Sequence, residues 1–355
     1  MKIFFFNVAP LPHSIDLERE LSNRGHQVIF WYLEGKSKYY PWQNIEYGHK
    51  FNIFDKKLKT FLDAYRQAMK HDVIIITGWH SWGHVLLALL CKLSGKKFAY
   101  WLDVPFPPKL GLKKILKKGL LSIADGYFIT GTAGIDFFIE QYKIDNKKCF
   151  DFPYLEHRPN DIEVKQKNEE RKTKLIKGNQ IKILISNRFL QRKGYSILLE
   201  ALNKFSAEEL NLFQINILGT GPEFEKYFNE FEKIPNLKLF GWVEYDDYLN
   251  KMSETDIFIH TSLQEPFGIP PIDAMSHGKL LISSDNVYSS LDRVIDGFNG
   301  YLYRKNSAED LFKILNSIAT NTSLIYKIGK NALETSTKYG VDHNEKIIID
   351  FYKKQ

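Results

Sequence analysis

The sequence predicts an α/β protein of two domains, each built around a parallel β-sheet. Short apolar segments alternate with longer helical patterns in both halves of the 355-residue chain, an order typical of parallel sheets with right-handed crossovers. A strongly polar stretch, residues 156–180, separates the halves and has the composition of an interdomain connection. We therefore expect domains at residues 1–160 and 161–335, followed by a helix at residues 336–355.

The predicted strands are the short apolar segments, and their order along the chain suggests where a site would lie. Ligands of parallel sheets bind beyond the carboxyl ends of the strands, so polar residues that follow a strand are the first candidates. The expected strands are Lys2–Val8, Gln27–Tyr32, Val73–Thr77, Lys96–Trp101 and Gly126–Thr130, then Lys182–Ser186, Gln214–Leu218, Leu237–Phe240, Asp256–His260 and Leu280–Ser283. The expected helices include Ser14–Asn23, Lys59–Lys70, Trp82–Leu93, Tyr195–Lys204 and Pro222–Phe231.

The composition is that of a soluble globular protein, with 44% hydrophobic and 26% charged residues. Only two cysteines occur, Cys91 and Cys149, so the sequence offers no disulfide framework or zinc motif and favours a reducing cytoplasm. The opening MKIFFFNVAP has too short an apolar run for a signal peptide, and Val85–Cys91 is far below the roughly 20 residues of a membrane span. The net charge of +7 suits an anionic ligand, whether nucleotide, nucleic acid or acidic lipid.

One stretch, Thr261–Asp285, combines several features of a ligand site. It follows an apolar strand and carries Glu265, then Gly268, two prolines that suit the first turn of a helix, and Asp273. A helix N-terminus attracts an anion and carboxylates accept from hydroxyls, so a phosphorylated sugar would fit both. The alternative is an ordinary strand–loop–helix connection in which Asp273 only complements the helix dipole.

Two further strands of the second half end in residues suited to phosphate. Arg188 and Lys193 follow the strand that ends at Ser186, and together they offer a planar fork of donors and a mobile point charge. The alternative is a solvated basic turn. Gly219 and Gly221 follow the next strand and allow a close backbone approach. Position 224 is Phe, and no GxxxxGK[ST] loop is present, which argues against an NAD enzyme or a P-loop NTPase.

Four motifs occur in the order found in one known family. SNRFLQRKG, GTGPE, FGWV and EPFGIPPIDAMSHGKLLISSD resemble the retaining GT-B glycosyltransferases of the family 4 type, the glycosyl transferases group 1, and RGHQV and Ala124–Gly126 match the family more loosely. The resemblance implies a GT-B fold, with two Rossmann-like domains whose parallel sheets face a central cleft. It implies an acceptor on the first domain, a nucleotide-sugar donor on the second, and a final helix that returns to the first.

The resemblance also implies roles for residues of the second half. Arg188 and Lys193 match the diphosphate-binding pair, and Glu265 matches the acid that contacts the donor sugar. Asp273 stands where a Glu usually holds the ribose, and it is one methylene shorter. The other donor-binding candidates are Gly219, Gly221, Trp242, Val243, Phe267, Gly268 and Ile269, of which Trp242 and Val243 would bracket the base; Trp242 could equally be a core aromatic.

The first half departs from the family in two places. Residues 7–13 read NVAPLPH, where the family often has a Gly-rich loop. Family members commonly carry a His after the fourth strand, and here Asp103 is the nearest polar residue. We take Asp103 as the catalytic candidate on the acceptor side, with His13 and His80 as alternatives. The other interpretation is that Asp103 is a capping or loop residue and that both histidines are structural.

The function implied is retaining transfer of a sugar from a nucleotide diphosphate sugar, of the UDP or GDP type, to a hydroxyl of a glycan or glycolipid. Bacterial cell-surface polysaccharide synthesis is the expected setting. No cofactor is expected, and no Asp-x-Asp metal motif occurs, so no metal is expected either. The alternatives are a GT-B nucleotide-sugar epimerase, a catalytically degenerate partner subunit, and a basic nucleic-acid-binding protein, for which no motif is present.

A basic segment of the first half suggests a membrane surface as a further partner. Residues 107–123, PPKLGLKKILKKGLLSI, contain lysines but no acid. On a helix, four of these lysines share one face and apolar residues the other, a pattern that suits an anionic membrane. The alternative is a helix whose apolar face packs on its own sheet. The lysines of the Lys109–Lys118 segment are Lys109, Lys113, Lys114, Lys117 and Lys118, and the apolar side comprises Leu112, Ile115, Leu116, Gly119, Leu120 and Ile123.

Overall fold

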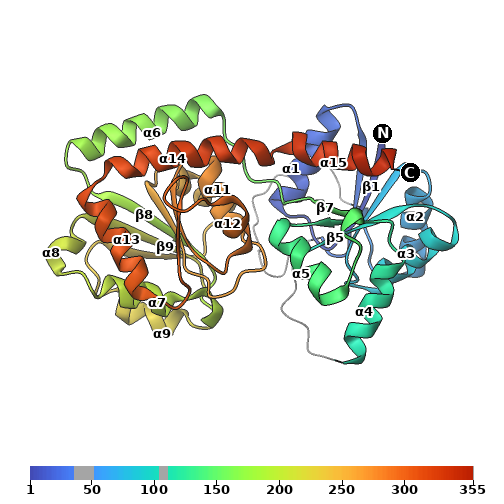
Figure 1. Ribbon diagram of the computed structural model, residues 1–355, viewed down its shortest axis with the longest axis horizontal. Helices are drawn as coiled ribbons and strands as arrows, with labels where there is room; N and C mark the ends of the chain where they lie inside the picture. The colour runs from blue at the N-terminus through green and yellow to red at the C-terminus, as the bar shows by residue number, and fades with distance from the viewer. Residues whose placement is uncertain (36–51, 104–110, 355) are drawn as a thin grey trace. The chain divides into compact units, whose positions relative to one another are not determined.

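The computed structural model describes residues 1–35, 52–103 and 111–354. The chain forms two compact units, shown in Figure 1. Unit 1 consists of residues Met1–Leu155 and Tyr339–Gln355, and unit 2 of residues Glu156–Lys338. Each unit is an α/β domain with one parallel sheet, so the predicted class of two parallel-sheet α/β domains is confirmed.

Unit 1 contains a seven-stranded parallel sheet in the order β3-β2-β1-β4-β5-β6-β7. Because successive side chains of a strand point to opposite faces, β1 places Phe4 and Phe6 on one face and Ile3 and Phe5 on the other. The strands are β1 Lys2–Asn7, β2 Gln27–Tyr32, β3 Asn52–Ile53, β4 Val73–Thr77, β5 Phe98–Leu102, β6 Gly126–Ile129 and β7 Cys149–Asp151, and the helices are α1 Pro12–Asn23, α2 Leu58–Ala68, α3 Trp82–Leu93, α4 Leu112–Ser122, α5 Thr132–Tyr142 and α15 Val341–Lys353.

Helix α15 packs on the unit 1 sheet although it lies at the end of the chain. Phe351 sits against Phe128, with ring centroids 5.4 Å apart. Gly126 leaves room for it, since a Cβ there would lie 2.7 Å from the Phe351 ring. At the other end of α15, Glu345 accepts from Arg24 at 2.8 Å. Both termini therefore belong to unit 1 (Figure 1).

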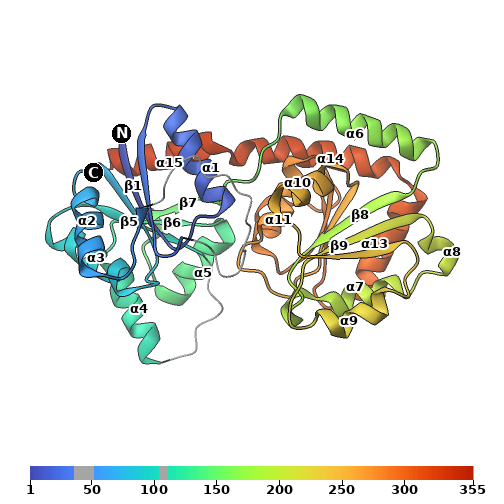
Figure 2. The ribbon, with the colours of Figure 1, turned by 180° about the vertical axis from the view of Figure 1, so that it is seen from behind.

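Unit 2 contains a six-stranded parallel sheet in the order β10-β9-β8-β11-β12-β13, seen from its other side in Figure 2. One face packs against α7, α9 and α13, and the other against α10 and α11. The strands are β8 Ile181–Ser186, β9 Phe213–Leu218, β10 Leu237–Gly241, β11 Ile257–His260, β12 Leu280–Ser284 and β13 Tyr301–Tyr303. The main helices are α6 Asp161–Ile176, α7 Tyr195–Leu202, α9 Phe224–Phe231, α10 Tyr245–Ser253, α11 Ile269–Ser276, α12 Tyr288–Arg293, α13 Ala308–Thr320 and α14 Ser323–Ser336.

The polar stretch at residues 156–180 differs from the connection that we expected. Most of it forms α6, which Asn160 caps by accepting from the backbone of Ile162. Arg171 of α6 forms a buried ion pair with Asp256, at 2.5 Å between Nη2 and Oδ2. The stretch is therefore a helix of unit 2, and a polar composition concealed it because only a few of its side chains are buried.

Helix α4 does not have the buried apolar face that the alternative arrangement requires. Ile115 and Leu116, which that alternative would pack on the sheet, are 68% and 60% exposed. Lys114 instead lies against the protein and donates to Gln141 at 3.4 Å, and the Lys117 ammonium lies 5.4 Å from the centre of the Trp79 ring. Lys109 is outside the described residues. Within the part of the chain that the structure describes, no helix is both long and apolar enough to span a bilayer.

Candidate functional site

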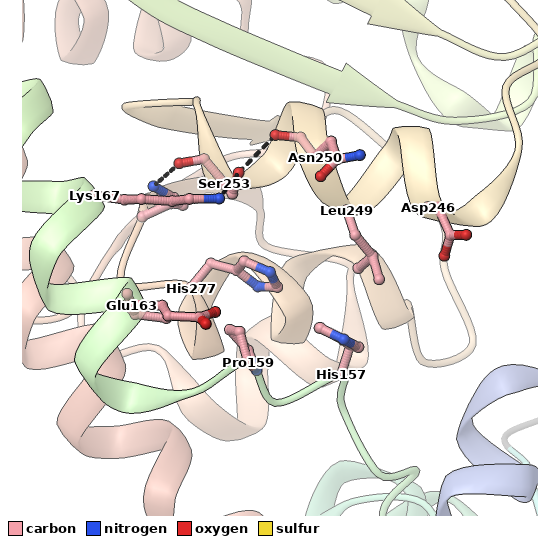
Figure 3. Close-up of a pocket in the computed structure, with 11 residues that line it drawn as sticks. His157, Pro159, Glu163, Lys167, Asp246, Leu249, Asn250, Ser253 and His277 are labelled. Carbon is pink, nitrogen blue, oxygen red and sulfur yellow. Dashed lines mark hydrogen bonds between the residues drawn. The ribbon is translucent and has the colours of Figure 1, made fainter.

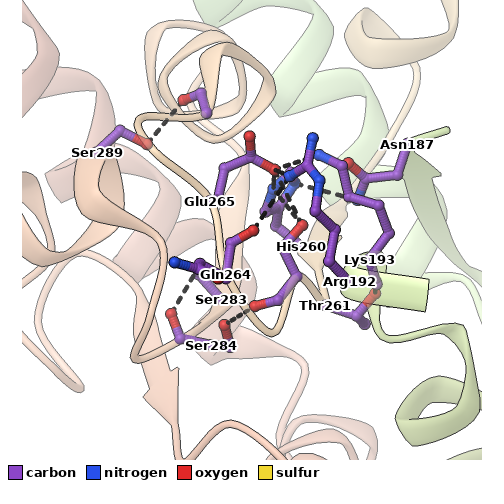
Figure 4. Close-up of polar contacts among 12 residues, drawn as sticks. Asn187, Arg192, Lys193, His260, Thr261, Gln264, Glu265, Ser283, Ser284 and Ser289 are labelled. Carbon is purple, nitrogen blue, oxygen red and sulfur yellow. Dashed lines mark hydrogen bonds and ion pairs between the residues drawn. The ribbon is translucent and has the colours of Figure 1, made fainter. Parts of the chain in front are cut away.

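A cluster of charged and polar side chains lies at the carboxyl edge of the unit 2 sheet (Figure 4). Strand β8 ends at Ser186 and leads to Asn187 and Arg188, while β11 ends at His260 and leads to Thr261. The two loops are joined where the Thr261 hydroxyl donates to the backbone carbonyl of Lys193 at 2.6 Å. Gly194 permits this contact, because its φ is +68° and a Cβ would lie 2.1 Å from the Thr261 carbonyl oxygen.

The cluster is centred on Glu265, whose carboxylate is 12% exposed. Its Oε2 accepts from the ammonium of Lys193, whose side chain is 9% exposed. The same oxygen lies 3.5 Å from Nη1 of Arg192 and 3.2 Å from the hydroxyl of Ser262. Its other oxygen points away from these partners (Figure 4). One oxygen of the Glu265 carboxylate is thus held by the protein, and the other faces away from these partners.

The charges of the cluster determine its protonation. Burial by itself raises the pKa of Glu265, but His260 and Lys193 outweigh it and hold that pKa well below its usual range. Burial lowers the pKa of Lys193, and repulsion from Arg192 and Arg188 lowers it further, against the opposite effect of Glu265. The carboxylate is therefore ionised at neutral pH. Lys193 and Arg192 lie beside it, and Arg188 is near enough to repel Lys193.

The glycines predicted to let a ligand approach the backbone lie close to other parts of the protein. A Cβ on Gly219 would lie 1.9 Å from the carbonyl oxygen of Asn187, and one on Gly221 would lie 2.5 Å from that of Phe189. Gly268, with φ +96°, would place a Cβ 3.1 Å from Glu265, and its carbonyl accepts from the hydroxyl of Ser289 at 2.7 Å. These glycines hold the loops of the site close together, and a ligand contact for them stays a prediction.

The other predicted donor-binding residues have different environments. Phe267 is buried, and Trp242 is half-buried in the loop after β10. Val243 is partly buried and packs on the core. Helix α11 begins at Ile269, as the prolines predicted, with Gly268 as its N-cap. Arg188 is half-buried at the carboxyl end of β8.

Asp273 has a structural environment that the sequence did not predict. It is 1% exposed, its Oδ1 accepts from the backbone N–H of His157 at 3.0 Å, and its Oδ2 accepts from the Tyr248 hydroxyl at 2.9 Å. These contacts hold α11, the chain before α6, and α10 together. The expected contact with a ribose stays a prediction, and it would compete with these hydrogen bonds.

In unit 1, Asp103 and His13 come together around one tyrosine at the carboxyl edge of the sheet. The Tyr154 hydroxyl donates to Asp103 at 2.6 Å, and Thr130 donates to the same carboxylate at 3.1 Å. The His13 ring packs on Tyr154, with centroids 4.3 Å apart, and burial lowers the pKa of His13 to about 3. His80 lies elsewhere, beside His84, with ring centroids 6.0 Å apart. The sequence had given no reason to single out Tyr154.

A separate cavity of about 370 Å³ lies at the opposite, amino edge of the unit 2 sheet (Figure 3). His157 and His277 stack along its wall, with ring centroids 5.4 Å apart. Lys279, fully buried, donates to the Asn168 side chain and to the Ser253 carbonyl, both at 2.8 Å. Burial lowers the pKa of Lys279 to about 7. These bonds tie the middle of α6 and the end of α10 to the start of β12, which is a structural role.

No group of three or more His, Cys, Asp or Glu side chains in the described ranges is arranged to hold a metal ion. At the carboxyl edge of unit 2, the positive charges of Arg188, Arg192 and Lys193 lie near one another, and Glu265 pairs with Lys193. Such an arrangement can bind a diphosphate through the cations and a hydroxylated group through the carboxylate.

Comparison with known proteins finds similarity to one family in the second half of the chain. Residues 166–335 match the family described as glycosyl transferases group 1. An uncharacterized glycosyltransferase of Methanocaldococcus jannaschii is 28% identical over 153 residues, 42% of this chain and 42% of that protein. The poly(glycerol-phosphate) alpha-glucosyltransferase of Bacillus subtilis is 27% identical over 169 residues, 46% of this chain and 24% of that protein. The matches thus span less than half of these relatives.

A solved structure matches over nearly the whole chain. The Anabaena protein Alr3699/HepE, determined in complex with UDP, superposes with a TM-score of 0.78 at 17% identity, covering 99% of this chain and 100% of that one. At this identity the likeness establishes the fold, which is the GT-B fold of two Rossmann-like domains.

Proposed function

Residues 166–335 belong to the glycosyl transferases group 1 family, and from that premise we propose that the chain is a retaining glycosyltransferase. It would move a sugar from a nucleotide diphosphate sugar to a hydroxyl of a glycan or glycolipid in bacterial cell-surface polysaccharide synthesis. The observation that carries this proposal is the cluster at the carboxyl edge of unit 2, where Lys193 pairs with Glu265 beside Arg188.

The main requirement on the site is to stabilise the negative charge of the leaving diphosphate. Negative charge grows on the diphosphate as the bond to the sugar breaks, and fixed positive groups stabilise it most where water is excluded. Arg188 and Lys193 would supply those charges. Helix α11 contributes less than its position suggests, because Pro270 and Pro271 have no N–H group to donate.

Glu265 would bind the donor sugar through its outward oxygen. A sugar hydroxyl can donate to that oxygen while Oε2 keeps its contact with Lys193. Lys193 has three donor hydrogens, so it can hold Glu265 and still reach a phosphate oxygen. The ion pair would in this way fix the distance between the sugar and the diphosphate.

We propose a donor of the UDP or GDP type and no cofactor. The UDP reported with the structurally similar HepE supports a nucleoside diphosphate as the ligand of this fold. Since Arg188, Arg192 and Lys193 already oppose the diphosphate charge, we also propose that transfer needs no metal ion. Activity in excess EDTA tests this, and a loss that Mg²⁺ or Mn²⁺ restores would contradict it.

The acceptor would bind unit 1. The Asp103 carboxylate lies at the carboxyl edge of that sheet and is already oriented by Tyr154 and Thr130. A carboxylate in this position can accept from a sugar hydroxyl. We propose that Asp103 binds the acceptor. His13, kept neutral by burial, would support it by packing on Tyr154.

An anionic membrane surface is a further proposed partner, and it would keep the enzyme peripheral at the inner face of the plasma membrane. The observation in favour is the outer face of α4, where Ile115 and Leu116 are exposed between Lys113 and Lys118. Exposed apolar side chains can enter the headgroup region while neighbouring lysines contact anionic lipid.

The proposal is tested by incubating the protein with UDP-, GDP- and dTDP-sugars and measuring nucleotide diphosphate release with and without glycan or lipid-linked acceptor. We expect release from one class of donor that acceptor stimulates. Conversion of a nucleotide sugar into its epimer, without acceptor and without net release of nucleotide, would instead indicate an epimerase. No release from any donor would favour a degenerate partner subunit.

A further inference from the structure

His260 is buried between the two loops that form the candidate site. Its side chain is 1% exposed at the end of β11. Its Nδ1 lies 3.3 Å from the side-chain nitrogen of Asn187, and its Nε2 lies 3.1 Å from the hydroxyl of Ser262. That hydroxyl lies 3.2 Å from Oε2 of Glu265, closer than Nε2 of His260, which lies 3.6 Å from the same oxygen. The four side chains form one continuous chain of contacts. Figure 4 labels three of them, Asn187, His260 and Glu265.

The donors and acceptors of this chain permit one consistent arrangement. The Asn187 amide can only donate through its nitrogen, so Nδ1 of His260 must accept and the ring proton must lie on Nε2. Nε2–H then donates to the Ser262 oxygen, which leaves the Ser262 hydrogen to donate to Glu265. Burial lowers the pKa of His260, which keeps the ring neutral as this arrangement requires. The charged groups that face the ring are Glu265, Lys193 and Arg192.

We infer that His260 is a positioning residue, which acts through Ser262 to hold Glu265 in the orientation that presents its free side to the donor sugar. Lys193 alone would not fix the orientation of the Glu265 carboxylate, because an ammonium on a flexible side chain can follow it to several positions. The Ser262 hydroxyl can fix that orientation, because the buried ring of His260 holds it in place. The chain begins at Asn187, next to Arg188, and therefore links the diphosphate end of the site to the sugar end. This inference rests on the proposed function.

The test compares His260→Gln with His260→Phe. Glutamine can place an amide N–H near the position of Nε2 and preserve the donor to Ser262, whereas phenylalanine fills the space without any hydrogen bond. His277→Gln, a change of another buried histidine of unit 2, is the matched control. Calorimetry with the free nucleoside diphosphate and steady-state kinetics with the sugar donor are measured for each, after circular dichroism has established folding.

We expect nucleoside diphosphate affinity within about twofold of wild type in all three variants. We expect kcat to fall about 10- to 100-fold in His260→Phe, the size of effect that a small misplacement of a positioned group produces, and to recover at least partly in His260→Gln. A folded His260→Phe protein with wild-type kcat would overturn the inference, as would an equal fall in nucleotide affinity and kcat in both His260 variants.

A second measurement is independent of turnover. Nitrogen-15 NMR of labelled histidine distinguishes the two neutral ring forms, and we expect the form protonated on Nε2 for His260, with a signal that shifts in Ser262→Ala. A ring protonated on Nδ1 would overturn the inference. If the wild-type protein releases no nucleotide from any donor but shows the expected ring form, the proposed function fails and the positioning of Glu265 by His260 stands.

Discussion

The ammonium of Lys193 donates to Oε2 of Glu265 inside unit 2, across two loops that follow different strands. Both residues were predicted from the sequence as ligands of one donor, Lys193 for the diphosphate and Glu265 for the sugar. Because both side chains are largely buried, a change of either residue leaves the charge of the other without its partner. Variants of the site must therefore be assessed for stability as well as for activity.

Glu265→Gln should lower turnover strongly and also lower the free energy of unfolding by about 1–3 kcal/mol, because it leaves the buried Lys193 ammonium without its carboxylate. Thermal denaturation and kinetics measure the two effects. The paired variant Glu265→Gln, Lys193→Met should recover stability and stay inactive. A single variant of wild-type stability would show that Lys193 gains little from Glu265.

Replacement of Asp273 should affect stability first. In Asp273→Ala the His157 N–H and the Tyr248 hydroxyl lose their acceptor, which should cost about 3 kcal/mol of unfolding free energy. Asp273→Glu adds a methylene to a packed position and should cost about 1–3 kcal/mol. Chemical denaturation measures both. Should Asp273→Glu instead keep wild-type stability and bind donor more tightly, the ribose contact would be its role.

Lys279 should make the stability of the protein depend on pH above neutrality. Its pKa is lowered from 10.5 to about 7 by burial, so between these values the unfolded chain holds a proton that the folded protein lacks, and the free energy of unfolding rises with pH. Relative to Lys279→Met, wild-type protein should gain about 1–2 kcal/mol between pH 7 and pH 9. A constant difference between the two proteins over this range would mean that Lys279 titrates as in water.

The outer face of α4 should bind vesicles that contain anionic lipid. Ile115→Ser, Leu116→Ser should abolish binding even at low salt, while Lys113→Gln, Lys118→Gln should weaken it mainly at low salt, because salt screens the lysines and not the apolar contact. Co-sedimentation measures both. Lys204→Gln on unit 2 is the control. Wild-type protein that stays in the supernatant at low salt would leave α4 an ordinary surface helix.

The sheets could be predicted from the sequence because central strands of a parallel sheet are buried on both faces and appear as continuous apolar runs. All the predicted strands are present, with only small changes at their ends. Strands β3, β7 and β13 were not predicted. They are very short and lie at the edges of the sheets, and Tyr303 is their one buried residue, so they carry no continuous apolar signal.

The kind of site could be predicted from the sequence, but the contacts between its residues could not. Residues that follow strands, such as Arg188 and Glu265, could be found from the order of elements alone. The pairing of Lys193 with Glu265 and the anchoring of Asp273 depend on which loops meet, which local sequence does not encode. His260 did carry a signal, since a histidine that ends an apolar strand lies at the ligand edge of a parallel sheet.

The central claim is that a nucleoside diphosphate binds at the carboxyl edge of the unit 2 sheet. Titration calorimetry with UDP, GDP and dTDP, on wild type, Arg188→Ala and Lys313→Ala, tests it most directly; Lys313 is an exposed cation on α13 that pairs only with Glu309 among the contacts described. We predict that one nucleotide binds wild type and Lys313→Ala alike, and that Arg188→Ala weakens binding by about 1.5–3 kcal/mol. Equal binding by all three proteins, or no binding of any nucleotide to wild type, would contradict the claim.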